Sequence, residues 1–141
     1  MGRGGITETK QEGDGATPVG VHRIVGMMYR PDRMAQPAEW ATPITPGDLW
    51  SDDPTDIEYN QLVRSPYYYS HERLRRADPL YDLVILTDWN WPNPVPGCGS
   101  AIFIHQWRRP GYPTEGCVAL RRDHLHRIAS AISPKSRLIV R

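Results

Sequence analysis

Short apolar runs, each bounded by proline, glycine or charged residues, dominate the pattern along this chain. In residues 101–105, Ala101, Phe103 and His105 occupy one face of an extended segment and two isoleucines occupy the other. Both faces are apolar until the histidine, which is typical of a buried strand that presents His105 at its end. Similar runs predict strands at residues 19–25, 81–88 and 137–141.

Helical spacing is rare by comparison. Residues 123–132 place four apolar side chains on one helical face, which predicts an amphipathic helix with all four in the core. These side chains are Leu125, Ile128, Ala129 and Ile132. Ser70 is a favourable N-cap, so we expect a second short helix from there through about residue 77. The pattern predicts a mainly β fold with one or two short helices.

Proline and glycine create long connections between these elements. The chain holds 14 prolines and 12 glycines, a composition that favours strands joined by loops. Residues 29–66 lack a clear period, and we expect a long, partly ordered excursion that covers one side of a pocket. Residues 89–97 are typical of a proline-rich turn. The glycine-rich, charged residues 1–16 predict a mobile lead-in, with an early strand within residues 2–7 as the alternative.

Length and charge limit the class of protein. With 141 residues and 39% hydrophobic content, the chain is long enough for one core, and we expect a single domain over residues 1–141. The 17 basic and 16 acidic residues give a net charge of +1, without the excess typical of nucleic-acid-binding proteins. No apolar run at the start has the character of a signal peptide or a transmembrane anchor.

His105 and Cys117 are the candidates for catalysis. A thiol attacks as the thiolate, and a usual pKa of about 8.5 leaves little thiolate at neutral pH, so a nucleophilic cysteine needs a nearby base or dipole. The prolines and glycine within residues 110–113 force a turn that returns Cys117 towards His105. Gly116 lets a substrate approach the backbone, and the N–H groups of Gly116 and Cys117 are candidate oxyanion donors.

Plainer explanations compete with a catalytic pair. A single cysteine in an apolar run is more often an inert core residue, and a single histidine more often a satisfied hydrogen-bonding group. A disulfide between Cys98 and Cys117, which are separated by 18 residues, would block the nucleophile. We favour a free Cys117. A zinc site is disfavoured because no Cys-x-x-Cys or His-Glu-x-x-His spacing occurs.

Several ordered motifs resemble those of the L,D-transpeptidase (YkuD-like) catalytic domain family. In that family a histidine precedes a Ser/Thr-x-Gly-Cys-apolar element, and here His105 precedes Thr114-Glu115-Gly116-Cys117-Val118. Residues 12–22 look like the family's Gly-x-x-Thr-Pro-x-Gly turn and strand, and residues 80–85 and 97–103 are similar to its central strands. The likeness spans most of the chain and implies a β-sandwich of mixed sheets.

The resemblance also implies roles for individual residues. Cys117 would take an acyl group from a peptide stem, and His105 would serve as the base and later as the acid. The backbone carbonyl of Gln106 would orient the imidazole, and Gly116 would join Cys117 in the oxyanion hole. Thr114 would hold the turn. The candidate substrate contacts are Thr114 and, by closeness in sequence to the site, Trp107, Arg109, Tyr112 and Arg121. Arg108, Arg109 and Arg121 are candidate clamps for stem carboxylates. Ordinary packing is the alternative for the two aromatic residues.

Two departures from the family pattern stand beside the cysteine. Many members have histidine immediately before the Gly-Cys pair, where this chain has Glu115, and arginine or asparagine two residues after it, where this chain has Ala119. The second histidine and the arginine therefore have no counterpart here. The loop between His105 and Cys117 is also shorter than in many relatives, which suggests a different pocket rim.

The activity implied by the resemblance is that of a peptidoglycan L,D-transpeptidase. An acyl-enzyme on Cys117 is resolved by an amine of a neighbouring stem, and no cofactor or metal is needed. Resolution by water, as in an L,D-carboxypeptidase or endopeptidase, is one alternative, and a non-catalytic cell-wall-binding module is another. We expect peptide stems as partners, carbapenem-type inhibitors as reactive ligands, and no nucleic acid. The expected location is the periplasm or cell envelope, with the cytoplasm as the alternative, and the sequence sets no oligomeric state.

Overall fold

The computed structural model describes all 141 residues and contains eleven short strands and one helix. In chain order the elements are β1 (Ile6–Thr7), β2 (Thr17–Pro18), β3 (Gly20–Tyr29), β4 (Thr42–Pro43), β5 (Asp48–Ser51), β6 (Leu62–Arg64), β7 (His71–Arg73), β8 (Leu83–Thr87), β9 (Phe103–Gln106), β10 (Val118–Leu120), α1 (Arg122–Ala131) and β11 (Arg137–Val140).

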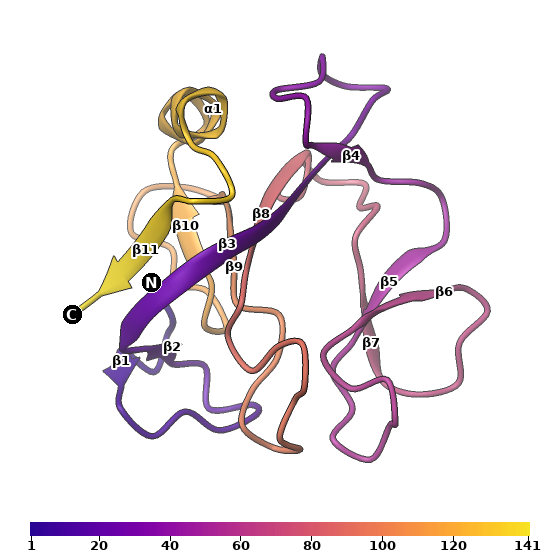
Figure 1. The fold of residues 1–141 in the computed structure, drawn as a ribbon, viewed down its shortest axis with the longest axis vertical. Coiled ribbons are helices and arrows are strands. Elements are labelled where there is room, and N and C mark those ends of the chain that lie inside the picture. Colours follow the sequence, from indigo (N-terminus) through magenta and orange to yellow (C-terminus); the bar gives the residue numbers. More distant parts are fainter.

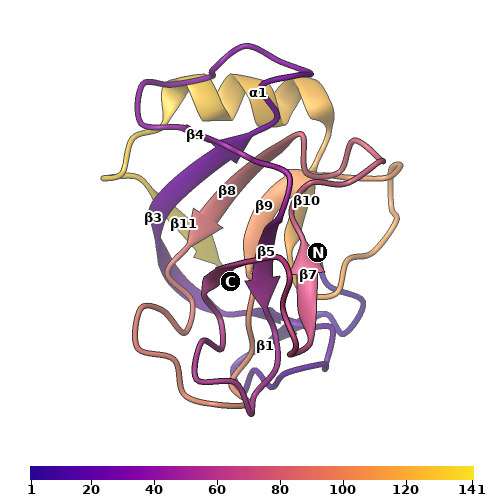
Figure 2. The same ribbon diagram turned by 90° about the vertical axis from the view of Figure 1, so that its right-hand side faces the viewer.

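A central mixed sheet organises these elements. Its strands run in the order β10-β9-β8-β3-β11, with β4 beside β3. The β9–β10 and β3–β4 pairs are parallel, whereas β8 pairs antiparallel with both neighbours. Figure 1 shows this sheet between α1 and a second, three-stranded sheet of order β6-β5-β7. In Figure 2 the second sheet lies in front of β8 and β9. The mainly β fold of mixed sheets is confirmed.

The alternation of side chains along β8 builds a core on each face of the central sheet. Leu83 and Ile85 belong to the cluster that contains Leu125 and Ala129 of α1. Val84 points to the opposite face, where it joins a cluster with Phe103 and Trp50. Because successive side chains of a strand alternate between faces, one apolar run serves both cores. The predicted strand within residues 81–88 is confirmed as β8.

The same alternation on β9 positions the candidate base. Ile104 packs in the cluster next to α1, whereas Phe103 packs in the cluster next to the three-stranded sheet. His105, two residues after Phe103, therefore points towards the three-stranded sheet. The predicted strand begins at Phe103 instead of residue 101, because Ala101 has a left-handed backbone with φ of 53°.

Two helical predictions need correction. The predicted helix over residues 70–77 is wrong, because His71–Arg73 form β7 and pair antiparallel with β5. Ser70 does not cap a helix; its hydroxyl donates to the Asp52 carboxylate at 2.6 Å. The helix predicted over residues 123–132 is confirmed as α1. Ile128 is 37% exposed, however, so it lies at the solvent edge of α1 instead of in the core.

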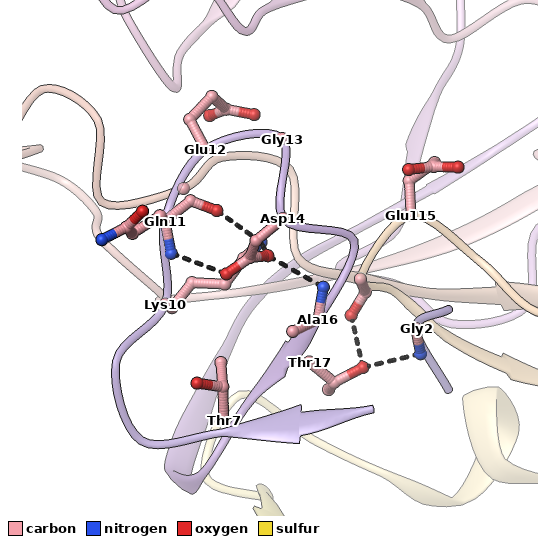
Figure 3. Close-up of polar contacts among 12 residues, drawn as sticks. Gly2, Thr7, Lys10, Gln11, Glu12, Gly13, Asp14, Ala16, Thr17 and Glu115 are labelled. Atoms are coloured by element: carbon pink, nitrogen blue, oxygen red, sulfur yellow. Dashed lines mark hydrogen bonds and ion pairs between the residues drawn. The ribbon is translucent and has the colours of Figure 1, made fainter. Parts of the chain in front are cut away.

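The first residues of the chain pack against the rest of the protein, in place of the expected mobile lead-in. β1 and β2 form a two-stranded parallel sheet, so the early strand proposed within residues 2–7 is present at Ile6–Thr7. Asp14 accepts hydrogen bonds from the backbone N–H groups of Gln11 and Ala16, both at 2.8 Å, and pairs with the buried Lys10 (Figure 3). These contacts fix the loop that leads into β2. The excursion over residues 29–66 contains β4, β5 and β6.

Candidate active site

A pocket of about 340 Å³ lies between the central sheet and the three-stranded sheet. It brings together most of the residues singled out from the sequence: His105, Trp107, Tyr112, Thr114 and Cys117. The opposite wall includes Asp52 and Glu72, which come from the segments that form the three-stranded sheet. The two sheets therefore create the pocket jointly.

The parallel pairing of β9 with β10 brings the thiol and the imidazole together. Ala119 pairs with His105 in the register of these strands. Cys117 lies two positions earlier and so projects on the same face as His105. The Phe103 N–H reaches the Cys117 sulfur at 3.5 Å. Parallel strands need a crossover connection, and the loop after His105 supplies it.

Thr114 closes the turn that leads into Cys117. Its hydroxyl donates to the Cys117 carbonyl at 2.6 Å and accepts from the Gly116 N–H at 3.2 Å. The Gly116 N–H is thus engaged within the turn, whereas the Cys117 N–H makes no hydrogen bond within the chain. Of the two oxyanion donors expected from the sequence, the structure leaves the Cys117 N–H free.

Gly116 occupies a site that has no room for a side chain. Its φ is +131°, and a Cβ there would lie 2.8 Å from the Ala16 carbonyl oxygen and 3.3 Å from Ile102. The buried Thr17 hydroxyl donates to the Gly116 carbonyl at 2.8 Å and accepts from the Gly2 N–H at 2.9 Å (Figure 3). Residues near the start of the chain therefore support the turn that precedes Cys117.

His105 is oriented by its neighbour's backbone. Its Nδ1 lies 2.7 Å from the Gln106 carbonyl oxygen. A carbonyl only accepts hydrogen bonds, so Nδ1 carries the proton and Nε2 of the neutral ring is left as a base. The Tyr81 ring meets the imidazole edge-on, with 5.1 Å between ring centroids. Burial lowers the pKa of His105 to about 4, so the imidazole is neutral at neutral pH.

The Cys117 thiol is also neutral at rest. Cys117 is only 9% exposed, and burial raises the pKa of its thiol to about 12. The thiol donates to the Ala101 carbonyl at 3.1 Å and makes no hydrogen bond to His105. Hydrogen bonds of a catalytic pair are often long or absent without substrate. The resting arrangement is thus a thiol turned to Ala101 beside an unprotonated imidazole.

One comparison with known proteins identifies the family. The model of the YkuD L,D-transpeptidase catalytic domain matches residues 1–140. The chain belongs to this family. No curated protein and no solved structure matches it significantly.

The pocket of this L,D-transpeptidase-family chain contains an acidic group that the sequence pattern did not reveal. Tyr81 donates its hydroxyl hydrogen bond to Glu72, and the Arg76 guanidinium lies 5.2 Å from the centroid of the Tyr81 ring. Burial raises the pKa of the Glu72 carboxyl, and its charge adds to the rise in the pKa of Cys117. The sequence pattern predicts a helix around Glu72. In the structure Glu72 instead pairs in β7 and lines the pocket.

Two of the arginines expected to bind substrate do not line the pocket. Arg121 forms a salt bridge with Asp123 at the surface. Arg109 lies over the Tyr112 ring, 5.1 Å from its centroid, and does not line the pocket. Arg108 lines the pocket instead. Two adjacent arginines in a loop have no period that assigns either of them to the pocket, so only the structure distinguishes Arg108 from Arg109.

Neither a disulfide nor a cluster of metal-ligating side chains occurs in this L,D-transpeptidase-family chain. Cys98 and Cys117 are both free thiols, the first half-buried and the second buried. No cluster of three or more histidine, cysteine or acidic side chains is arranged to hold a metal ion. Glu115, which replaces the histidine of many members, is exposed and pairs with Arg3 at 2.8 Å. None of the helices is both long and apolar enough to span a membrane.

Proposed function

We propose that this chain is a peptidoglycan L,D-transpeptidase that works through a thioester on Cys117, as a single catalytic domain of the cell envelope. The observation that carries the proposal is the parallel register of β9 and β10, which puts the thiol and His105 on one face of the sheet within one pocket. The Gln106 carbonyl fixes the tautomer that a base requires.

In the first half-reaction, Cys117 attacks the carbonyl carbon of a peptide bond between an L-centre and a D-residue. The thiol turns from Ala101 towards His105, and Nε2 takes its proton as the S–C bond forms. The Cys117 N–H donates to the developing oxyanion. The C–N bond then breaks, and the imidazolium gives its proton to the leaving amine. The products are a thioester and a released D-amino acid or peptide.

In the second half-reaction, an amine of a neighbouring stem attacks the thioester carbon. His105 removes a proton from this amine and returns it to the departing sulfur, so Cys117 regains its thiol. A new amide joins the two stems, with no net change in protons. Water in place of the amine yields a free carboxylate by the same steps, which is the activity of a carboxypeptidase or endopeptidase.

The neutral resting pair is suited to this chemistry. A thiolate–imidazolium pair would need two buried charges, whereas here both groups stay uncharged until the substrate carbonyl is in place. Trp107 and Tyr112 provide aromatic surface at the rim, and Arg108 provides a cation for stem carboxylates. We propose these three residues as substrate contacts.

Intact mass spectrometry tests the proposal. The native chain is incubated with purified muropeptides and, separately, with a carbapenem. We expect a thioester adduct with the first and, with the second, a mass increase equal to the whole drug, because opening of the lactam ring releases no leaving group. Cys117→Ala should give neither adduct, whereas Cys98→Ala should behave as the native chain.

The products distinguish the candidate activities. Accumulation of dimeric muropeptides supports transfer, and shortened monomers alone would indicate hydrolysis. Absence of an adduct and of any product from the native chain would overturn the proposal in favour of a wall-binding module.

A further inference from the structure

Asn60 is a buried polar residue that the proposed reaction does not use directly. It lies between β5 and β6, is 2% exposed and does not line the pocket. Its side-chain oxygen accepts from the Trp50 indole at 2.9 Å and from the Ala101 N–H at 3.0 Å. Its side-chain nitrogen donates to the carbonyls of Trp89 and Asn90 at 3.1 and 2.7 Å. The amide thus joins three separate segments.

One of these partners connects Asn60 to the candidate nucleophile. Ala101 has a φ of 53°, in the left-handed region, where a residue with a side chain is strained. Its N–H is bound by Asn60, and its carbonyl accepts the hydrogen bond of the Cys117 thiol at 3.1 Å. Asn60 therefore binds the peptide unit that precedes Ala101, and Cys117 binds the peptide unit that follows it.

We propose that Asn60 is a positioning residue, which fixes the resting place of the Cys117 thiol by holding Ala101 in its left-handed conformation. The inference rests on the proposed role of Cys117 as the nucleophile. Asn60 acts from the segment of the three-stranded sheet, so the second sheet controls the thiol as well as forming a wall of the pocket.

The chemistry of the amide explains why asparagine fits this position. Two N–H groups approach its oxygen and two carbonyls approach its nitrogen. An aspartate would offer no donor to the carbonyls, and an apolar residue would leave the N–H groups of Trp50 and Ala101 unpaired in the interior. Loss of the acceptor for the Ala101 N–H would free Ala101 to return to the ordinary region of negative φ.

Alkylation of Cys117 tests the inference without any peptidoglycan. All variants are made in a Cys98→Ser background, and iodoacetamide rate constants are measured from pH 7 to pH 10 by mass spectrometry. Asn60→Ala should raise the rate at each pH by about threefold or more, because the protonated thiol loses its acceptor and its pKa falls. Turnover of muropeptides, measured on the same samples, should fall about tenfold or more, mainly in kcat.

A second substitution separates positioning from loosening. Glycine adopts positive φ without a Cβ clash, so Ala101→Gly added to Asn60→Ala should restore slow alkylation. Simple loosening predicts the opposite, because a glycine adds flexibility and would speed alkylation further. Gln61→Ala is the matched control: its side-chain amide binds the Pro92 carbonyl and the Trp91 indole but does not touch Ala101, so alkylation should stay at the native rate.

These measurements test the positioning role of Asn60 independently of the proposed transpeptidase activity. A double variant that alkylates as fast as Asn60→Ala, or an Asn60→Ala variant that alkylates at the native rate, overturns the positioning role. If circular dichroism shows that Asn60→Ala does not fold, Ala101→Val with Asn60 intact replaces it, since a β-branched residue disfavours positive φ. An unchanged alkylation rate in that variant also overturns the inference. A native chain without transpeptidase activity would refute the proposed function and leave the alkylation results valid.

Discussion

Replacing Gly116 with alanine should destabilise the protein strongly, because the turn before Cys117 has no space for a Cβ. The added atom would lie 2.8 Å from the Ala16 carbonyl oxygen, closer than ordinary packing permits. The carbonyl cannot move away easily, since the Thr17 N–H of the same peptide unit donates to the Gly5 carbonyl at 2.8 Å. The φ of +131° adds backbone strain that glycine alone avoids.

The two effects set the expected magnitude. Overpacking of a tight site costs about 1–3 kcal/mol, and an unfavourable backbone conformation costs about the same again. The free energy of unfolding should therefore fall by about 2–6 kcal/mol. A chain of this length has an unfolding entropy of roughly 0.3 kcal/mol per degree at its midpoint, so Tm should fall by roughly 7–20 °C.

Gly111→Ala is the matched control. Gly111 also has a positive φ, of +74°, but a Cβ there meets nothing within 4 Å. Only the strain of about 1 kcal/mol applies, equivalent to roughly 3 °C. Both variants are compared by thermal and urea denaturation followed by circular dichroism. If Gly116→Ala loses no more stability than Gly111→Ala, the close approach of the turn to Ala16 is not a feature of the folded protein.

Three further predictions concern charge, pH and packing. Glu72→Gln should lower the pKa of Cys117 and speed its alkylation at pH 8 by about threefold to tenfold; an unchanged or slower rate would contradict the electrostatic effect. Buried His105 stays neutral down to a pKa of about 4, whereas in the unfolded chain it protonates near its ordinary pKa of 6.5. As the pH falls from 6.5 to 4, the native chain should therefore lose up to about 1.4 kcal/mol per pH unit more than His105→Gln in urea titrations. Equal losses in the two proteins would argue against a neutral buried imidazole. Leu125→Ala should cost about 2–5 kcal/mol and Ile128→Ala less than about 1 kcal/mol, and similar costs would refute the inner and outer faces assigned to α1.

The apolar strands and the return of Cys117 to the face of the sheet that carries His105 could be predicted from local pattern. A strand that is buried on both faces shows as a continuous apolar run, and the prolines and glycine of the following loop require the chain to return. These properties depend on residues close together in the sequence. The predicted fold class and the central strands were therefore confirmed.

The acidic wall and the support of the thiol could not be predicted in the same way. Glu72 lies in a strand of three residues whose existence depends on pairing with β5, more than twenty positions earlier. Asn60 reaches Ala101 across a separation of 41 residues. Neither contact leaves a periodic signal. The engagement of the Gly116 N–H by Thr114 likewise depends on the side-chain rotamer and not on the motif itself.

Cys117 stays protonated and donates a hydrogen bond to the Ala101 carbonyl, and this state protects the sulfur against oxidative damage. Peroxides attack the thiolate and not the thiol, and they convert it stepwise to sulfenic and sulfinic acids. A buried thiol with a pKa of about 12 offers almost no thiolate at neutral pH, so it resists this loss in an oxidising compartment. The same property slows every reagent that must meet the free enzyme. A ligand gains full access to the reactivity of the thiol only where His105 takes its proton as the new bond forms.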